Sequence, residues 1–378
     1  MESSQIRVGR AITSEGVAEN AVITIQDGRI VAVEPGPPVE DEFAGLWAVP
    51  GFVDTHSHGA VGVSYGDPDV AANQRAIDYH RTQGSTTIFA STVSEPIEKL
   101  ERQLTVLRGM VETQELAGIH LEGPFLAEEK KGAHDPALLR DPDPESVERL
   151  IAAGGPALKM ITMAVEREHS EAAARRFTEA GVKVAFGHSN ADEAVTRESL
   201  NWGVCIVTHL FSAMNSIHHR KPGPVPVLLT DDRCMVELIC DGIHHDPVIA
   251  RMSIDAAGID RVGMITDAMS ATGKGDGRYI LGELKVDVEN GTARLVTTDG
   301  SQGAIAGSTH TMAKAFQFLI KEVGCSIEEA AVMTSTTPAR WHGLEDVGRL
   351  APGRWADICL VDDDGNLRGV MRRGETIV

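Results

Sequence analysis

Two histidines that lie two positions apart are the first residues whose spacing suggests chemistry. The stretch GFVDTHSHG, residues 51–59, places His56 and His58 at the end of a short apolar run. In a β-strand, residues i and i+2 point to the same face, so both imidazoles can reach one metal ion. The spacing therefore predicts a strand that ends in a pair of metal ligands.

Further side chains that can bind metals follow other apolar runs. The candidate metal ligands are His56, His58, Glu122, His188, His209 and Asp267. Nitrogen and oxygen donors of this kind suit Zn²⁺, Fe²⁺, Mn²⁺ or Co²⁺ and disfavour Cu⁺. Glu122 can bridge two ions through its two carboxylate oxygens, with His188 and His209 on one side and the other candidates opposite. The number of ligands alone leaves one ion or two open.

Eight apolar β-type runs between about residues 50 and 345 explain how these scattered side chains can meet. The runs alternate with stretches of helical pattern, such as DVAANQRAIDYHRTQG and HSEAAARRFTEAG. This alternation is typical of βα units on a parallel sheet, and eight such units close into a barrel. Parallel strands bring their carboxyl ends to one face. We therefore predict an α/β fold, a TIM-like (β/α)₈ barrel over residues 51–345, with the candidate ligands at one end.

The two ends of the chain have a different pattern. Residues 1–50 and 346–378 contain short β-type runs separated by DG and PG dipeptides, a pattern typical of hairpins. The similar texture of the two segments suggests that they pair with each other. We predict a small β-sandwich formed by both termini, interrupted by the barrel.

Composition limits the partners and the compartment. Lys and Arg total 35 against 55 for Asp and Glu, so the net charge of −20 repels nucleic acids and anionic membranes. We find no signal-peptide pattern and no apolar run near the roughly 20 residues that span a bilayer. The five cysteines have no CxxC spacing, which argues against a disulfide framework or zinc ribbon. We expect a cytoplasmic protein without nucleic-acid or membrane partners.

Several motifs, taken in order, resemble one superfamily. They are GFVDTHSHG, HLEGPF, GHSNA, THLFSAM, DGIHHDP and MITDAMSATG. Together they resemble the amidohydrolase superfamily and, within it, the N-acetylglucosamine-6-phosphate deacetylases, along nearly the whole chain. Many other members carry a carboxylated lysine where this family has the glutamate that Glu122 matches. Lys159, the one lysine of the fourth β-type run, lies at its beginning and hence at the wrong end of the barrel.

The resemblance implies a reaction and roles for individual residues. The reaction is metal-dependent deacetylation of N-acetylglucosamine 6-phosphate to glucosamine 6-phosphate and acetate, by water activated on one or two divalent ions, with Zn or Fe expected. Asp267 would act as general base, with metal ligation alone or helix capping as its alternatives. His134 in KKGAHDP would polarise the acetyl carbonyl, and His244 would bind sugar hydroxyl groups.

The resemblance also implies a site for the substrate phosphate. It implies phosphate contacts from Ser212 and Ala213, and from Arg220, which would reach the active site of a neighbouring subunit in a homodimer. Ser212 stands where the family usually has asparagine, so a side-chain amide is replaced by a hydroxyl. Gly307 can approach the substrate through its backbone, although the serine and threonine that follow it could equally cap a helix.

Other functions remain open at this stage. The same metal site would serve a deacetylase of a related N-acyl amino-sugar phosphate, such as N-acetylgalactosamine 6-phosphate. A cyclic-amide or dipeptide amidohydrolase is a more distant alternative, which the missing strand-end lysine disfavours. A non-catalytic barrel that acts as a binding protein would be expected to have lost ligands, yet every expected ligand is present.

Overall fold

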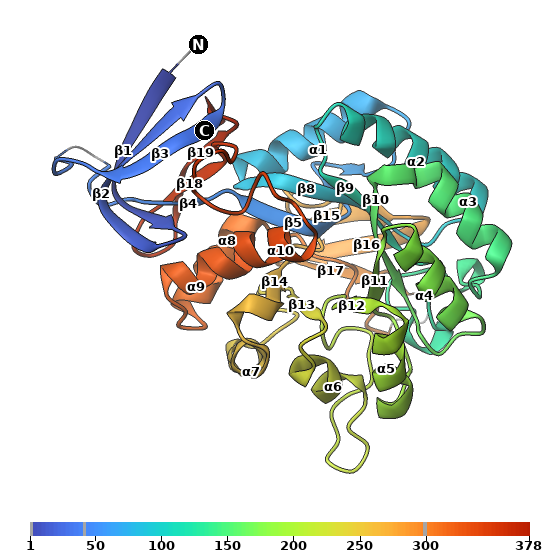
Figure 1. Cartoon of the computed structure of the whole chain (residues 1–378). Coiled ribbons are helices and arrows are strands. Elements are labelled where there is room, and N and C mark those ends of the chain that lie inside the picture. The colour runs from blue at the N-terminus through green and yellow to red at the C-terminus, as the bar shows by residue number, and fades with distance from the viewer. Residues whose placement is uncertain (1–2, 41–42, 298–300) are drawn as a thin grey trace.

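The computed structural model describes residues 3–40, 43–297 and 301–378. Residues 1–2 and 41–42 of the predicted amino-terminal segment, and 298–300 of the predicted barrel segment, lie outside this description. Figure 1 shows two main bodies, a barrel surrounded by helices and, at its side, a sheet that contains strands from both ends of the chain. The division of the chain at residues 50 and 345 stays a prediction.

Eight parallel strands form the barrel, which confirms the predicted fold. In chain order they are β5 (Phe52–Ser57), β8 (Ser85–Thr92), β9 (Gly118–Glu122), β10 (Leu158–Met163), β11 (Lys183–Phe186), β12 (Val204–Val207), β13 (Met235–Leu238) and β14 (Val262–Met264). The segment after β14 closes the barrel, because the Asp267 amide donates to the His56 carbonyl at 2.8 Å and the His58 amide donates to the Ala268 carbonyl at 2.8 Å.

Helices follow the strands and cover the outside of the barrel (Figure 1). They are α1 (Val70–Thr82), α2 (Ile97–Glu112), α3 (Pro144–Gly154), α4 (Ser170–Glu179), α5 (Glu193–Ser199), α6 (Pro224–Thr230), α7 (Pro247–Ala257), α8 (Met312–Lys321), α9 (Ile327–Ala331) and α10 (Thr337–Trp341). Local sequence explains several starts: Asp143 and Asp246 each accept a backbone N–H, and each precedes a proline at the first helical position. In α2, Leu100, Leu104 and Leu107 recur at helical spacing and are fully buried.

The barrel interior changes from apolar to polar along its axis. Met160, Ala185, Ile206 and Met235 form an apolar cluster. Farther along the strands, His120 bonds the Ser91 hydroxyl at 2.9 Å and the Thr162 hydroxyl at 2.8 Å. The metal-ligand candidates then occupy the carboxyl ends. The buried polar groups in the middle are therefore paired with one another, as low dielectric surroundings require.

Strands from both ends of the chain share one seven-stranded sheet, which confirms the predicted pairing of the termini. They are β1 (Ser3–Thr13), β2 (Gly16–Gln26), β3 (Arg29–Pro35), β4 (Trp47–Pro50), β18 (Ile358–Val361), β19 (Leu367–Arg372) and β20 (Glu375–Thr376). Strand β4 pairs with β1 on one side and β18 on the other, so it joins the two halves. Because β4 ends only two residues before β5 begins, the sheet is anchored directly to the barrel.

Two smaller sheets lie at the carboxyl end of the barrel. Strands β15 (Gly277–Leu281), β16 (Leu284–Glu289) and β17 (Thr292–Leu295) form an antiparallel sheet between β14 and α8, and β6 (Gly59–Ala60) pairs with β7 (Val63–Ser64). Within the described ranges, no helix is both long and apolar enough to cross a membrane.

Candidate metal centre and substrate cavity

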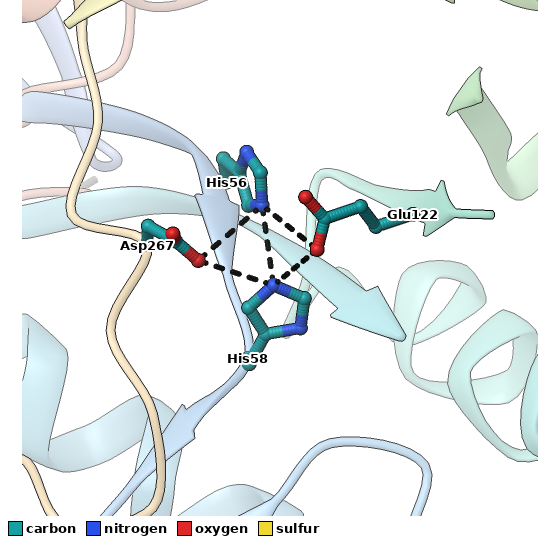
Figure 2. A group of neighbouring side chains, drawn as sticks. All are labelled: His56, His58, Glu122 and Asp267. Atoms are coloured by element: carbon teal, nitrogen blue, oxygen red, sulfur yellow. Dashed lines mark hydrogen bonds and ion pairs between the residues drawn. The ribbon is translucent and has the colours of Figure 1, made fainter. Parts of the chain in front are cut away.

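Four of the predicted metal ligands point toward one another at the carboxyl end of the barrel (Figure 2). The Nε2 atoms of His56 and His58 are 3.1 Å apart. His58 Nε2 lies 3.1 Å from Glu122 Oε2 and 3.2 Å from Asp267 Oδ1. The ligand atoms of all four residues lie within 4.8 Å of one another, and all four are buried. Buried lone pairs this close require a cation between them, so the donor set fits a divalent metal.

The other oxygen of Glu122 faces a second pair of histidines. His188 Nε2 and His209 Nε2 are 3.1 Å from each other, and they lie 3.1 Å and 3.0 Å from Glu122 Oε1. Glu122 therefore lies between two groups of ligands, with Oε2 facing the group of Figure 2 and Oε1 facing the histidine pair. This is the arrangement that a carboxylate bridging two ions would need.

The backbone at these ligands is unusual. His188, His209 and Asp267 lie in the turns just after their strands, which end at Phe186, Val207 and Met264, and have φ values of 48°, 28° and 48°. Non-glycine residues rarely occupy this left-handed region, and it persists where the surroundings fix it. The turn after each strand therefore directs these side chains back over the barrel axis, which sequence spacing alone cannot reveal.

The charges in the cluster balance one another. Burial favours the neutral form of Glu122 and Asp267, but the surrounding histidines outweigh it and hold the pKa of both carboxyls below their ordinary values. Burial also lowers the pKa of His56 and His58, but the same two carboxylates raise it above the ordinary value. Without a metal, His56 and His58 therefore tend to bind protons at the positions where a metal cation can bind. Metal binding must release these protons.

His134 faces the cluster as a hydrogen-bond donor. The Ser94 amide donates to His134 Nδ1 at 3.2 Å, so the proton of the neutral ring lies on Nε2. That Nε2 atom is 3.5 Å from Glu122 Oε2. Burial lowers the pKa of His134 to about 4, so the ring is neutral near pH 7. His134 can thus donate to an oxygen placed over the metal cluster.

His244 is a second imidazole that lines the cavity and is held in one orientation. His244 donates from Nδ1 to Asp241 Oδ2 at 2.8 Å, and Asp241 Oδ1 also accepts the His244 amide at 2.8 Å. His244 therefore presents Nε2 to the cavity. His245 is different, because it is buried with its ring nitrogens against the carbonyls of Ile239 and Leu210, so its role is structural.

These side chains surround one cavity of about 370 Å³. Of the predicted site residues, the cavity is lined by His58, Glu122, His134, His188, His209, Ser212, Ala213, His244, Asp267 and Gly307. His56 lies beneath it and is fully buried. The volume suits a monosaccharide-sized molecule better than a polymer.

Gly307 packs directly against Asp267. Its φ is 61°, and a Cβ there would lie 2.9 Å from the Asp267 carbonyl oxygen. The next residue, Ser308, donates its amide to that carbonyl at 2.7 Å and its hydroxyl to the Thr266 carbonyl. Thr311, rather than Ser308, caps α8. Ala268 forms isolated bridges with Ser57 and Ser308, and residues 269–276 form turns and loop, so the alternative that Asp267 caps a helix is wrong.

The predicted phosphate residues are brought only partly together. The Ser212 amide donates to the His209 carbonyl at 3.0 Å, so Ser212 can offer a ligand its hydroxyl. The side chain of the nearby Asn215 donates from Nδ2 to the Asn190 carbonyl at 2.9 Å and ties two loops together. Arg220 is exposed, contacts His219 Nε2 at 2.7 Å, and is not among the described residues that line the cavity.

Two residues that the motifs did not single out also belong to the site. Lys130 lines the cavity, its carbonyl accepts from His188 Nδ1 at 2.8 Å, and its ammonium group donates to the Met214 carbonyl at 3.1 Å. Glu237 lies under His56, with Oε2 3.3 Å from Nδ1. The available signal for Glu237 was a single charge inside the apolar run MVELIC. Lys159 is the second residue of β10, at the far end from the cluster, as predicted.

Comparisons with known proteins agree with this geometry. The model of the amidohydrolase family matches residues 47–377. N-acetylgalactosamine-6-phosphate deacetylase of Escherichia coli O157:H7 is 33% identical over 98% of each chain. N-acetylglucosamine-6-phosphate deacetylase of Vibrio furnissii is 31% identical over 98% of this chain and 94% of its own. A solved structure from Mycobacterium smegmatis, an aspartate-to-alanine mutant of N-acetyl-D-glucosamine-6-phosphate deacetylase in complex with N-acetyl-D-glucosamine-6-phosphate, is 38% identical, covers both chains completely and has a TM-score of 0.94.

Proposed function

The chain belongs to the amidohydrolase family, and on that premise we propose that it hydrolyses the acetamide of N-acetylglucosamine 6-phosphate to glucosamine 6-phosphate and acetate. The observation that carries this function is one cavity that combines a histidine and carboxylate metal cluster with the oriented donors His134 and His244. Amide hydrolysis needs water activation, a donor to the carbonyl and contacts to the sugar.

The family and the cluster indicate a divalent metal, and we propose zinc or iron, as one or two ions, with Glu122 placed to contribute to either site. His56, His58 and Asp267 would hold one ion, and His188 and His209 the other. When bound, a divalent ion lowers the pKa of water from about 15.7 to about 7 and polarises an amide carbonyl.

Side chains of the protein would then transfer the protons of the reaction. Asp267 accepts a proton from the water whose oxygen bonds to the acetyl carbon, and passes a proton to the sugar nitrogen as the carbon–nitrogen bond breaks. His134 donates from Nε2 to the carbonyl oxygen, which gains negative charge in the transition state. His244, held by Asp241, contacts the sugar hydroxyl groups, and Gly307 lets the chain pass close to Asp267 and the substrate.

We further propose that the active protein is a homodimer. Ser212 and Ala213 would contact the phosphate from within one subunit, while Arg220 would reach it from the neighbouring one. The exposed position of Arg220, away from its own cavity, suits this role, because guanidinium groups match the geometry of phosphate oxygens. The five free cysteines suit a reducing compartment, so we place the protein in the cytoplasm.

Replacing Arg220 tests the phosphate role. Arg220→Ala is expected to raise the KM for the phosphorylated substrate by about 10- to 100-fold, because a hydrogen bond to a charged group contributes about 1.5–3 kcal/mol. The KM for unphosphorylated N-acetylglucosamine should barely change. Lys221→Ala, which removes the neighbouring charge of the same loop, serves as the matched control. Equal effects of Arg220→Ala on both substrates would remove Arg220 from phosphate recognition.

Acetate release distinguishes the possible substrates. N-acetylglucosamine 6-phosphate, N-acetylgalactosamine 6-phosphate and unphosphorylated N-acetylglucosamine would be compared at equal concentration. We expect the first to be hydrolysed fastest. Preference for the second would assign the activity of the Escherichia coli relative instead. Release from cyclic amides or dipeptides alone would refute the amino-sugar assignment.

A further inference from the structure

Glu237 is a buried carboxylate outside the substrate cavity. It lies in β13, has no exposed surface, and does not line the cavity. Its neighbours on the strand, Val236 and Leu238, point to the opposite face, so the Glu237 carboxylate faces the barrel interior. Burying a carboxylate there, away from water, is costly unless a partner compensates for it. The hydrogen-bond partners of Glu237 should therefore indicate its role.

The contacts of Glu237 are to the strand that carries the metal-ligand pair. Glu237 Oε2 lies 3.3 Å from His56 Nδ1, and Oε1 lies 3.4 Å from the Thr55 hydroxyl. His56 is itself fully buried, so no water competes for its Nδ1 atom. His56 can donate to the carboxylate only if the proton of its neutral ring lies on Nδ1. The lone pair of Nε2 then faces Glu122 and Asp267.

We infer that Glu237 is a positioning residue that fixes the tautomer and orientation of His56. It thereby strengthens metal binding in the His56 half of the metal centre, the half formed by His56, His58 and Asp267. The inference rests on the proposed metal-dependent function. Carboxylates that accept from a ligating histidine make its other nitrogen more basic and hold the ring in place. Glu237 would act through His56, without touching substrate or metal.

The other ligand histidines lack such a partner, which makes the two halves unequal. Among the described residues, the buried Nδ1 atoms of His58 and His209 have no hydrogen-bond partner. His188 Nδ1 donates to a neutral acceptor, the Lys130 carbonyl. The half that contains His56 also includes the Asp267 carboxylate. The proposed effect of Glu237 is therefore confined to the half that contains His56.

Titration of the metal-free protein with Co²⁺ can test the inference in each half of the metal centre separately. His188→Gln weakens metal binding by the pair His188 and His209 and leaves the His56 half intact. His58→Gln weakens metal binding by the His56 half and leaves that histidine pair intact. Adding Glu237→Gln should raise the Kd for Co²⁺ about 10- to 100-fold in the His188→Gln background and less than about twofold in the His58→Gln background. The cobalt absorption spectrum should also change only in the first background. Equal effects in both backgrounds, or none in either, would overturn the inference.

Two further variants separate charge from packing. Glu237→Asp keeps the carboxylate but shortens it, so it should bind Co²⁺ more tightly than Glu237→Gln, whose shape is closer to the native residue. The reverse order would show that shape matters and would contradict the inference. Asp357→Asn removes another buried carboxylate, which accepts the Arg373 amide far from the cluster, and should leave both Kd values unchanged. If the wild-type protein binds no metal, the proposed function itself fails.

Discussion

Replacing Asp267 with asparagine is expected to lower kcat by about 10²- to 10⁴-fold, the range over which a positioned acid or base acts. Asparagine has nearly the same shape but cannot accept a proton. The neighbouring histidines hold the pKa of Asp267 below the ordinary value despite burial, so its carboxylate is ionised at neutral pH and able to accept a proton. Steady-state acetate release at saturating substrate measures this loss.

Metal content separates the role of Asp267 as base from that of ligand. The Asp267→Asn protein should still bind metal, since His56, His58 and Glu122 remain and the amide oxygen can approach the ion. Elemental analysis of the purified variant checks this. Unchanged turnover would rule out Asp267 as the base, and loss of turnover together with all metal would show that ligation is its main role.

Replacing His134 with alanine is expected to lower kcat by about 10²- to 10³-fold, the usual cost of removing a donor to a developing oxyanion. Because burial lowers the pKa of His134 to about 4, the ring is neutral above that pH and keeps its Nε2 proton. The loss should therefore be similar at about pH 6 and pH 8. Metal content should not change, since Nε2 donates rather than ligates.

His134→Gln serves as the matched variant. Its side-chain amide can donate a hydrogen bond from nearly the position of Nε2, so it should recover part of the activity lost in His134→Ala. Equal activity of the alanine variant and the wild type would exclude His134 from the reaction. A loss that glutamine does not reduce would indicate that the ring acts through packing.

The fold and most of the metal cluster were predictable for a simple physical reason. Parallel strands bury their apolar residues and expose their carboxyl ends at one face, so residues that follow apolar runs must converge there. The pair at His56 and His58 and the glutamate at Glu122 obey this rule directly. His188 and His209 do as well, although their left-handed backbone, which aims the rings, leaves no clear pattern in the sequence.

The remaining site residues depend on contacts between segments that lie far apart in the sequence. Glu237 in β13 contacts His56 in β5, although the two residues are 181 positions apart along the chain. Lys130 acts on His188 through its carbonyl, which any residue type would provide. Arg220 was predicted from a motif, but it is exposed and lies outside the cavity lining, so its proposed role would need a second subunit. Residues that touch the cluster only through their backbone cannot be identified from spacing.

Acetate release by metal-free and metal-restored protein tests the central claim most directly. The protein would be stripped by a chelator, freed of it, and assayed with N-acetylglucosamine 6-phosphate while zinc or iron is added back stepwise. We expect no release from the stripped protein and full recovery as metal is added, since the cluster alone cannot activate water. Equal acetate release by the stripped and restored proteins would contradict the proposed metal-dependent mechanism.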